Sequence, residues 1–256
     1  MTLIVTHISR FGIIHATDGN LTAVNGSPAG EAPKVFPVPF LNTALTVAGS
    51  YGVGGQSMDL WMRNFIQEQQ RLNCDSLRAF ATALRDALQD KMTPQEKNQG
   101  SMLHLAGYVR ENDASHAEFW FVRNVYCMDK NTGEYSDFRD TFQISEDFWE
   151  RDWPQNNLAQ LFQQDGYQIY INGFTSGRVS YVILQSVMDQ FFRSVWRNAA
   201  WRFRPPVSLE ENTLIVDLYI RTIGVLFRIS NYTAPIIGGT PQTFTIAPPS
   251  RADGSA

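Results

Sequence analysis

The chain has 256 residues, of which 43% are hydrophobic and 18% are charged, and its formal net charge at pH 7 is −4. This length and composition fit one large or two small globular domains with a sizeable core. The charge excludes the basic surface that binds nucleic acids or acidic membranes, so neither partner is expected. The two cysteines, Cys74 and Cys127, are far apart in the sequence and favour free thiols over a disulfide framework or a zinc site.

The N-terminal stretch lacks the basic region and long apolar core that make a signal peptide. No apolar run approaches the ~18 residues that a membrane-spanning helix needs. We therefore expect the protein to be cytoplasmic.

Two strands are predicted at the N-terminus, because Leu3–Ile8 and Ile13–Thr17 are rich in branched residues and flank a four-residue turn. They form a hairpin. His7 and His15 lie on these strands without a third metal ligand nearby, so they are interpreted as solvent-facing side chains.

A second hairpin is predicted from Lys34–Phe40 and Thr43–Ala48, after a loop over Asn25–Pro33 that is rich in glycine, proline, serine and alanine. Gly49–Gly55 is dense in glycine. It lacks the Gly-Lys-Ser/Thr ending of a phosphate loop, so it is interpreted as a turn before a helix.

Helical periodicity predicts two helices, Ser57–Leu72 and Asp75–Met92, the second capped by Asp75. Two long strands follow, Met102–Arg110 and His116–Tyr126. Two strand pairs separated by two helices favour a sheet sandwich with outer helices over a parallel βαβ array.

The segment from Met128 to Gln164 is polar, aromatic and rich in acidic residues. It is interpreted as a long insertion that contacts a neighbouring subunit, covers a cleft, or is a solvated elaboration of the surface. Glu146 and Glu150, four residues apart, are expected on the exposed face of a short helix rather than as paired catalytic carboxylates.

The C-terminal part is predicted as a strand, two helices and a last strand. Ser208 is expected to cap a helix that is apolar almost all round, as in a buried helix or one at a subunit interface. The expected elements are a strand over Tyr167–Asn172, helices over Arg178–Trp201 and Leu209–Ile229, a strand over Gln242–Ile246 and a frayed tail over Pro248–Ala256.

Four residues in the first fifty can each be given a role in amide hydrolysis. If Met1 is removed, Thr2 carries both a hydroxyl nucleophile and an α-amine with a pKa near ~8 that can act as its base. Lys34 would supply positive charge that keeps this amine free, and Asp18 would pair with Lys34. The N–H of Gly49 would face the developing oxyanion.

Asp18 follows Thr2 by 16 residues, and Lys34 follows Asp18 by 16. With Thr22 and the Ala-Gly-Ser run that contains Gly49, this order resembles the β-type subunits of the proteasome family, including the bacterial relatives HslV and Anbu. The resemblance covers about two-thirds of the chain. It implies a threonine-nucleophile amide hydrolase, with an α+β fold built as a four-layer αββα sandwich.

The resemblance also implies further site residues. Thr22 would contact the substrate backbone, and Ser176, in the turn after the strand that ends near Asn172, would support the N-terminal amine. Leu21, Ala32 and Val47 would line the first specificity pocket and favour apolar or small residues. The family's late aspartate and serine are missing, and the corresponding positions hold Ala234 and Ile237.

The expected organisation is a single domain over 1–247, with the insertion at about 128–165 and a tail over 248–256. The substrate would be a peptide or protein, neither a metal nor an organic cofactor is required, and the chain would form a ring or helical homo-oligomer. Whether an ATP-dependent unfoldase is a partner is left open. The alternatives are a non-catalytic ring or scaffold subunit, a small-amide hydrolase or transpeptidase on the same fold, and a plain binding module.

Overall fold

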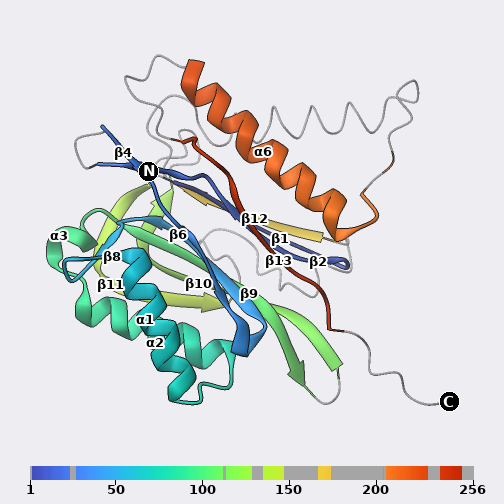
Figure 1. Ribbon diagram of the computed structural model, residues 1–256. Coiled ribbons are helices and arrows are strands. Elements are labelled where there is room, and N and C mark those ends of the chain that lie inside the picture. The colour runs from blue at the N-terminus through green and yellow to red at the C-terminus, as the bar shows by residue number, and fades with distance from the viewer. Residues whose placement is uncertain are drawn as a thin grey trace.

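A computed structural model gives the fold of the chain over residues 2–23, 27–111, 114–128, 135–146, 167–173, 204, 206–229 and 237–249. The fold is mixed α+β, and its two main sheets are antiparallel throughout (Figure 1). This confirms the predicted class. Among the described residues, no helix combines the length and the apolar character needed to cross a membrane.

The first sheet has four strands in the order β12-β1-β2-β13. The N-terminal hairpin is confirmed, since β1 and β2 pair directly. The last strand has the predicted bounds. The strands are β1 (Leu3–Ser9), β2 (Gly12–Thr17), β12 (Tyr167–Gly173) and β13 (Gln242–Ile246).

The second sheet has five strands in the order β11-β10-β9-β6-β5. It contains the second predicted hairpin and the two predicted long strands. The strands are β5 (Val35–Val38), β6 (Thr43–Gly49), β9 (Ser101–Glu111), β10 (Ala114–Met128) and β11 (Tyr135–Glu146).

Strand β11 lies within the segment 128–164, for which the sequence predicts no strand. It pairs with β10, so Glu146 lies on a strand and not on a short helix. Phe142 is 5% exposed and packs in the core, which explains the strand in spite of its acidic neighbours. Glu150 lies outside the described residues.

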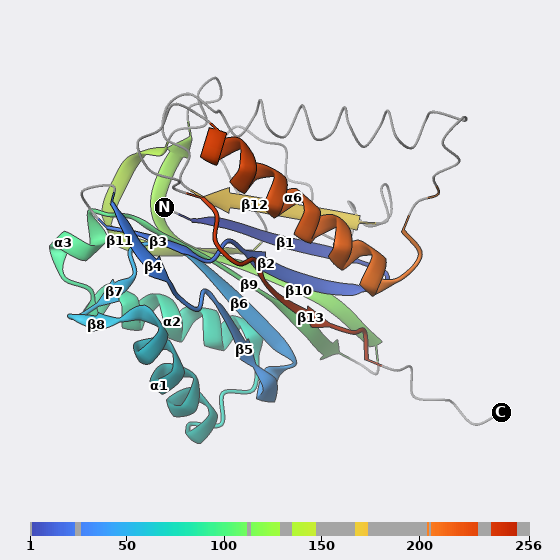
Figure 2. The same cartoon turned by 45° about the horizontal axis from the view of Figure 1, so that its top comes forward.

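Figure 2 shows the two sheets with helices α1 (Met58–Arg71) and α2 (Leu77–Lys91) on one side and α6 (Leu209–Ile229) on the other. Three clusters of buried side chains hold these elements together. One joins α1 and α2 to the five-stranded sheet, and a second joins α6 to the four-stranded sheet. The third lies between the two sheets and contains Ile4, Ile8, Ile13, Ala44, Met102 and Phe119.

Shorter elements connect these layers. They are β3 (Asn20–Thr22), β4 (Pro28–Glu31), β7 (Gly52–Val53), β8 (Gln56–Ser57), α3 (Pro94–Lys97) and the 3-10 turn η1 (Pro39–Leu41). β4 lies within the segment predicted as a loop, and it pairs with β3.

Serine side chains cap the N-termini of α2 and α6. The cap of α2 is Ser76 and not Asp75, because the Ser76 hydroxyl accepts the N–H of Ala79. The predicted cap Ser208 is confirmed by its bond from the N–H of Glu211. The helix predicted over Arg178–Trp201 lies outside the described residues.

The interpretation of His7 and His15 as solvent-facing is wrong, since they are only 8% and 0% exposed. His15 Nε2 bonds the carbonyl of Ala106 across the sandwich. The Thr6 hydroxyl lies 3.4 Å from Nδ1 of His15 and 3.1 Å from Nδ1 of His104. The burial of His15 is therefore possible because both of its ring nitrogens have polar neighbours, one of them on the other sheet.

Candidate active site

Asp18 and Lys34 form a buried ion pair where the two sheets meet. Asp18 directly follows β2 of the four-stranded sheet, and Lys34 directly precedes β5 of the five-stranded sheet. The Lys34 ammonium lies 3.2 Å from Oδ1 of Asp18, and both side chains are 0% exposed. The predicted pairing of these residues is therefore confirmed, although their catalytic roles remain predictions.

The Asp18 carboxylate also holds two backbone N–H groups from distant parts of the chain. Oδ1 accepts the N–H of Leu3 at 2.9 Å, and Oδ2 accepts the N–H of Gly238 at 3.2 Å. The N–H of Asp18 in turn donates to the Leu3 carbonyl. One carboxylate thus joins the start of β1, the Lys34 ammonium and the segment before β13.

The Lys34 ammonium has a second acceptor, the backbone carbonyl of Asn20 at the start of β3. Burial lowers the pKa of Lys34 from its ordinary value, while the Asp18 carboxylate opposes this shift. Burial raises the pKa of Asp18, while Lys34 and the N–H groups of Leu3 and Gly238 oppose that shift. Each partner therefore stabilises the charge that burial disfavours on the other.

Thr2 is 4% exposed and directly precedes β1. The next residue, Leu3, pairs with Gly173 at the end of β12. A Cβ atom on Gly173 would lie only 2.1 Å from the Thr2 carbonyl oxygen, so only glycine permits this approach. The backbone of Thr2 is thus held by β12 on one side and, through Leu3, by Asp18.

Gly49 ends β6 in a left-handed conformation, with φ of 100°. A Cβ there would lie 2.1 Å from the Gly100 carbonyl oxygen, which explains the need for glycine. Two residues earlier, the N–H of Val47 donates to the Lys34 carbonyl at 3.0 Å. N–H groups two residues apart on a strand point the same way, so the Gly49 N–H is directed toward the side of β6 where Lys34 lies.

The described residues predicted to contact the substrate lie on β3, on β6 and in the loop before Lys34. Leu21 and Thr22 lie half-buried on β3, next to the residue whose carbonyl binds Lys34, and Ala32 lies half-buried in the loop before Lys34. Val47 is 2% exposed, and its side chain packs in the core beneath α1 and α2. Val47 bonds the Lys34 segment through its backbone N–H, while its side chain belongs to the core. Ser176 lies outside the described residues.

Four residues around the ion pair have no motif that sequence reasoning could have found. Asn20 and Gly238 contribute backbone groups, and the Tyr51 hydroxyl donates to the Pro33 carbonyl at 2.6 Å. The side chain of Gln242 bonds the backbone on both sides of Pro33. The only sequence signal is the glycine pair that includes Gly238, just before the last predicted strand.

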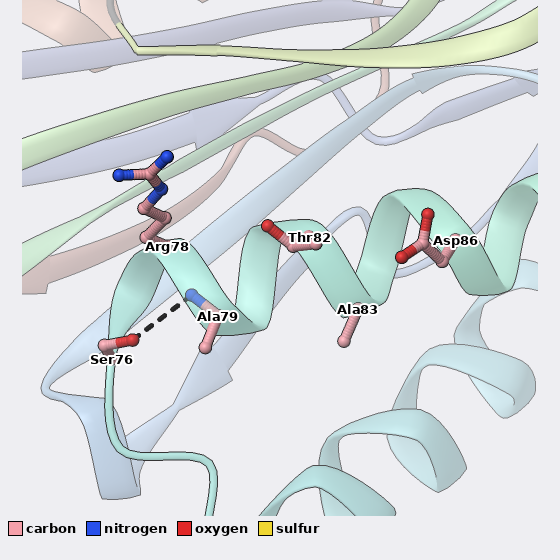
Figure 3. A pocket seen from close by; sticks show the side chains of 6 residues that line it. All are labelled: Ser76, Arg78, Ala79, Thr82, Ala83 and Asp86. Atoms are coloured by element: carbon pink, nitrogen blue, oxygen red, sulfur yellow. Dashed lines mark hydrogen bonds between the residues drawn. The ribbon is translucent and has the colours of Figure 1, made fainter.

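A separate hollow lies along the exposed side of α2 (Figure 3). It contains none of the residues around Asp18, and its one drawn bond is the Ser76 cap of the helix. The residues that line it are Ser76, Arg78, Ala79, Thr82, Ala83 and Asp86.

No group of three or more His, Cys, Asp or Glu side chains within the described ranges is placed to hold a metal ion. The chemistry available around Asp18 is that of a fixed cation, a carboxylate and directed backbone N–H groups beside a threonine.

No model of a known protein family matches the chain, and no curated protein is significantly similar to it in sequence.

Proposed function

We propose that the protein is a threonine-nucleophile amide hydrolase that acts on peptides. The observation that carries this proposal is the atom shared by two groups: Oδ1 of Asp18 accepts both the N–H of Leu3 and the ammonium of Lys34. The peptide bond that follows Thr2 is thereby tied to the same oxygen as a fully buried cation.

The proposed reaction begins after Met1 is removed. The Thr2 Oγ attacks the scissile carbonyl carbon, and its proton passes to the Thr2 amine. A positive charge nearby disfavours protonation of that amine, which is the role of Lys34. The N–H of Gly49 stabilises the oxyanion.

The amine then gives its proton to the leaving nitrogen as the C–N bond breaks, and an ester to Thr2 remains. Water, deprotonated by the same amine, hydrolyses this ester and regenerates the hydroxyl. The scheme uses no metal or organic cofactor.

We extend the proposal to the fold, as a single four-layer αββα sandwich of the N-terminal nucleophile class over 1–247. It is supported by the three core clusters between α1 and α2, the two sheets and α6. It is also supported by the order of Thr2, Asp18, Lys34 and Gly49.

Assembly into a ring or helical homo-oligomer is part of the same proposal. It is supported by exposed apolar side chains on α6, namely Leu214, Leu218, Val225 and Ile229, which are 63%, 46%, 54% and 72% exposed. Light scattering at micromolar concentration tests it, and a monomer alone would refute it.

Intact mass spectrometry after incubation with a β-lactone tests the chemistry. We expect a protein that has lost Met1 and carries one acyl group on Thr2, and we expect no adduct on the Thr2→Ala variant. Retention of Met1, or an adduct that Thr2→Ala does not remove, would contradict the proposal.

A non-catalytic subunit on the same fold is the second candidate. It is favoured by Ile237, which is 1% exposed and packs in the core beneath α6, at a position where the resemblance implies a polar residue. It predicts that the β-lactone leaves the wild-type protein unmodified.

A further inference from the structure

The segment from Ala32 to Lys34 carries the lysine to the site, and three of its backbone groups are held by nearby parts of the chain. The N–H of Ala32 donates to the Gly19 carbonyl, and the Lys34 carbonyl accepts from Val47. The Pro33 carbonyl accepts from the hydroxyl of Tyr51.

The two remaining groups, the Ala32 carbonyl and the Lys34 N–H, are both bonded by the side-chain amide of Gln242. Its Oε1 accepts the N–H of Lys34 at 2.8 Å, and its Nε2 donates to the carbonyl of Ala32 at 2.6 Å. Pro33 lies between these groups and has no N–H of its own. One amide therefore bridges the proline and fixes the backbone at the base of the lysine side chain.

Gln242 reaches Lys34 from the opposite sheet. It is the first residue of β13, where the register places it beside Thr17, the residue before Asp18. Lys34 belongs to the five-stranded sheet through the Val47 bond. The bridge thus links the strand next to Asp18 with the segment that carries its partner.

We propose that Gln242 is a positioning residue that holds the Lys34 ammonium in reach of Asp18 and of the Thr2 amine. This inference rests on the proposed function for its role in catalysis. The ammonium of a lysine stands on a flexible four-carbon stem, so it has a defined position only if the backbone that carries the stem is fixed. When the backbone is released, the ammonium can leave a site where burial disfavours its charge.

The chain contains a matched control for the loss of such a bridge. Gln89 on α2 makes the same two kinds of bond to β11, since its Nε2 donates to the Asp140 carbonyl at 2.9 Å and its Oε1 accepts the Phe142 N–H at 2.7 Å. Both glutamines are half-buried. Gln89→Leu therefore removes an equal structural link that does not touch Lys34.

The first measurement is the pH profile of acylation of Thr2 by a β-lactone, followed by intact mass. In Gln242→Leu we expect the rate near neutral pH to fall about tenfold, because without the cation the amine pKa rises by about one unit and fewer amines are free. The deficit should shrink toward about pH 9. Gln89→Leu should keep the wild-type profile.

The proposal would be overturned if the acylation rate of Gln242→Leu equalled that of the wild type at every pH, or were lower by the same factor at every pH. Either result would mean that the pKa of the Thr2 amine had not moved, as expected if Gln242 were only a structural link. If Gln242→Leu does not fold, Gln242→Met replaces it. Methionine has similar length and volume but makes neither bond, so the same profile is expected.

The second measurement is independent of Thr2 chemistry. Brief acetylation by acetic anhydride, mapped by peptide mass, reports access to the Lys34 ammonium, which is 0% exposed in the native fold. We expect at least about tenfold faster acetylation of Lys34 in Gln242→Leu and no change in Gln89→Leu. Equal protection in all three proteins would overturn the positioning role.

The two measurements separate the failure of each proposal. If the β-lactone does not modify the wild-type protein, the proposed function fails and acetylation alone decides whether Gln242 positions Lys34. If acylation occurs with an unchanged profile in Gln242→Leu, the function stands and the inference about Gln242 fails.

Discussion

The ammonium of Lys34 lies 3.2 Å from Oδ1 of Asp18, and neither side chain is exposed to solvent. The pair joins two sheets that are adjacent in space but not hydrogen-bonded to each other as strands. Since a buried charge is costly when it is alone, the stability of the fold and the geometry of the site depend on both partners together.

Lys34→Met should therefore destabilise the protein by about 3–5 kcal/mol, because it leaves the Asp18 carboxylate buried without its cation. Asp18→Asn with Lys34→Met should recover part of this loss, because the buried charge is then removed as well. The measurement is the free energy of unfolding in urea at pH 7.

The control for this prediction is Lys91→Met. Lys91 also forms a pair, with Asp90 at 2.8 Å, but its side chain is 63% exposed and that of Asp90 is 72% exposed. Such a pair is screened by water, so no measurable change in unfolding is expected. A loss of stability in Lys34→Met no greater than in Lys91→Met would contradict the interpretation of the buried pair.

The parts of the fold that local patterns specify were predicted well. Leu209–Ile229 and Gln242–Ile246 have the predicted bounds, since each has a strong periodic pattern between clear turn signals. β11 was missed because its acidic residues suggested a surface loop. Its pairing with β10 also shifts register between Arg123 and Val125, which interrupts the alternation.

The interior polar groups could not be predicted from local sequence. His15 is satisfied by Ala106, which is 91 residues away, and His104 by Asn172, which is 68 residues away. A strand histidine without such partners is normally placed toward water. Only the packing of the two sheets supplies the partners.

The same reason limits the prediction of the site. Asp18 and Lys34 were found because they lie in one short ordered stretch near Thr2. Gly238 and Gln242 are more than 200 residues further along the chain, and each acts through a backbone group or bonds to one. No local pattern therefore connects either residue with Asp18 or Lys34, even though Gln242 bonds Lys34 through its side chain.

Gly49→Ala should reduce both stability and acylation of Thr2. Alanine disfavours the φ of 100°, and its Cβ would lie 2.1 Å from the Gly100 carbonyl oxygen, so β6 must shift. Gly30→Ala is the matched control, because Gly30 has φ of 99° and a Cβ there would meet nothing within 4 Å.

The difference between these two variants therefore measures the close contact alone. We expect Gly49→Ala to lose at least about 1 kcal/mol more than Gly30→Ala in urea unfolding, and to react at least about tenfold more slowly with the β-lactone. Equal effects would show that the backbone at Gly49 is not tightly held.

The buried histidines should make the fold sensitive to mild acid. Burial lowers the pKa of His7 and His15 to about 4 and that of His104 to about 3, from 6.5 in an unfolded chain. The unfolded chain therefore binds more protons below pH 6.5, so their stabilisation is complete above this pH and is lost as the pH falls toward 4. Each histidine contributes a slope of about 1.4 kcal/mol per pH unit in this window.

His7→Phe tests one part of that slope. The His7 ring stacks on Tyr167, and its Nδ1 has no hydrogen-bond partner among the described residues. Phenylalanine keeps the stacking and removes the titration. The free energy of unfolding, measured in urea between about pH 6 and pH 4.5, should therefore depend on pH with a slope that is smaller by about 1.4 kcal/mol per pH unit. His116→Gln, a change of an exposed side chain on β10, is the control. An unchanged slope in His7→Phe would contradict the prediction.

Gly173→Ala tests how tightly β12 holds Thr2. The new Cβ would lie 2.1 Å from the Thr2 carbonyl oxygen and 3.0 Å from the Leu3 Cα, so β12 must separate from β1 at the residue of the proposed nucleophile. We expect acylation of Thr2 by the β-lactone to slow at least about tenfold, because small misplacements of reacting groups are costly. Gly224→Ala is the control, since its Cβ would come no closer than 3.4 Å to another atom outside its own helix, and alanine favours the helix. Acylation of Gly173→Ala at the wild-type rate would mean that Thr2 is not positioned through β12.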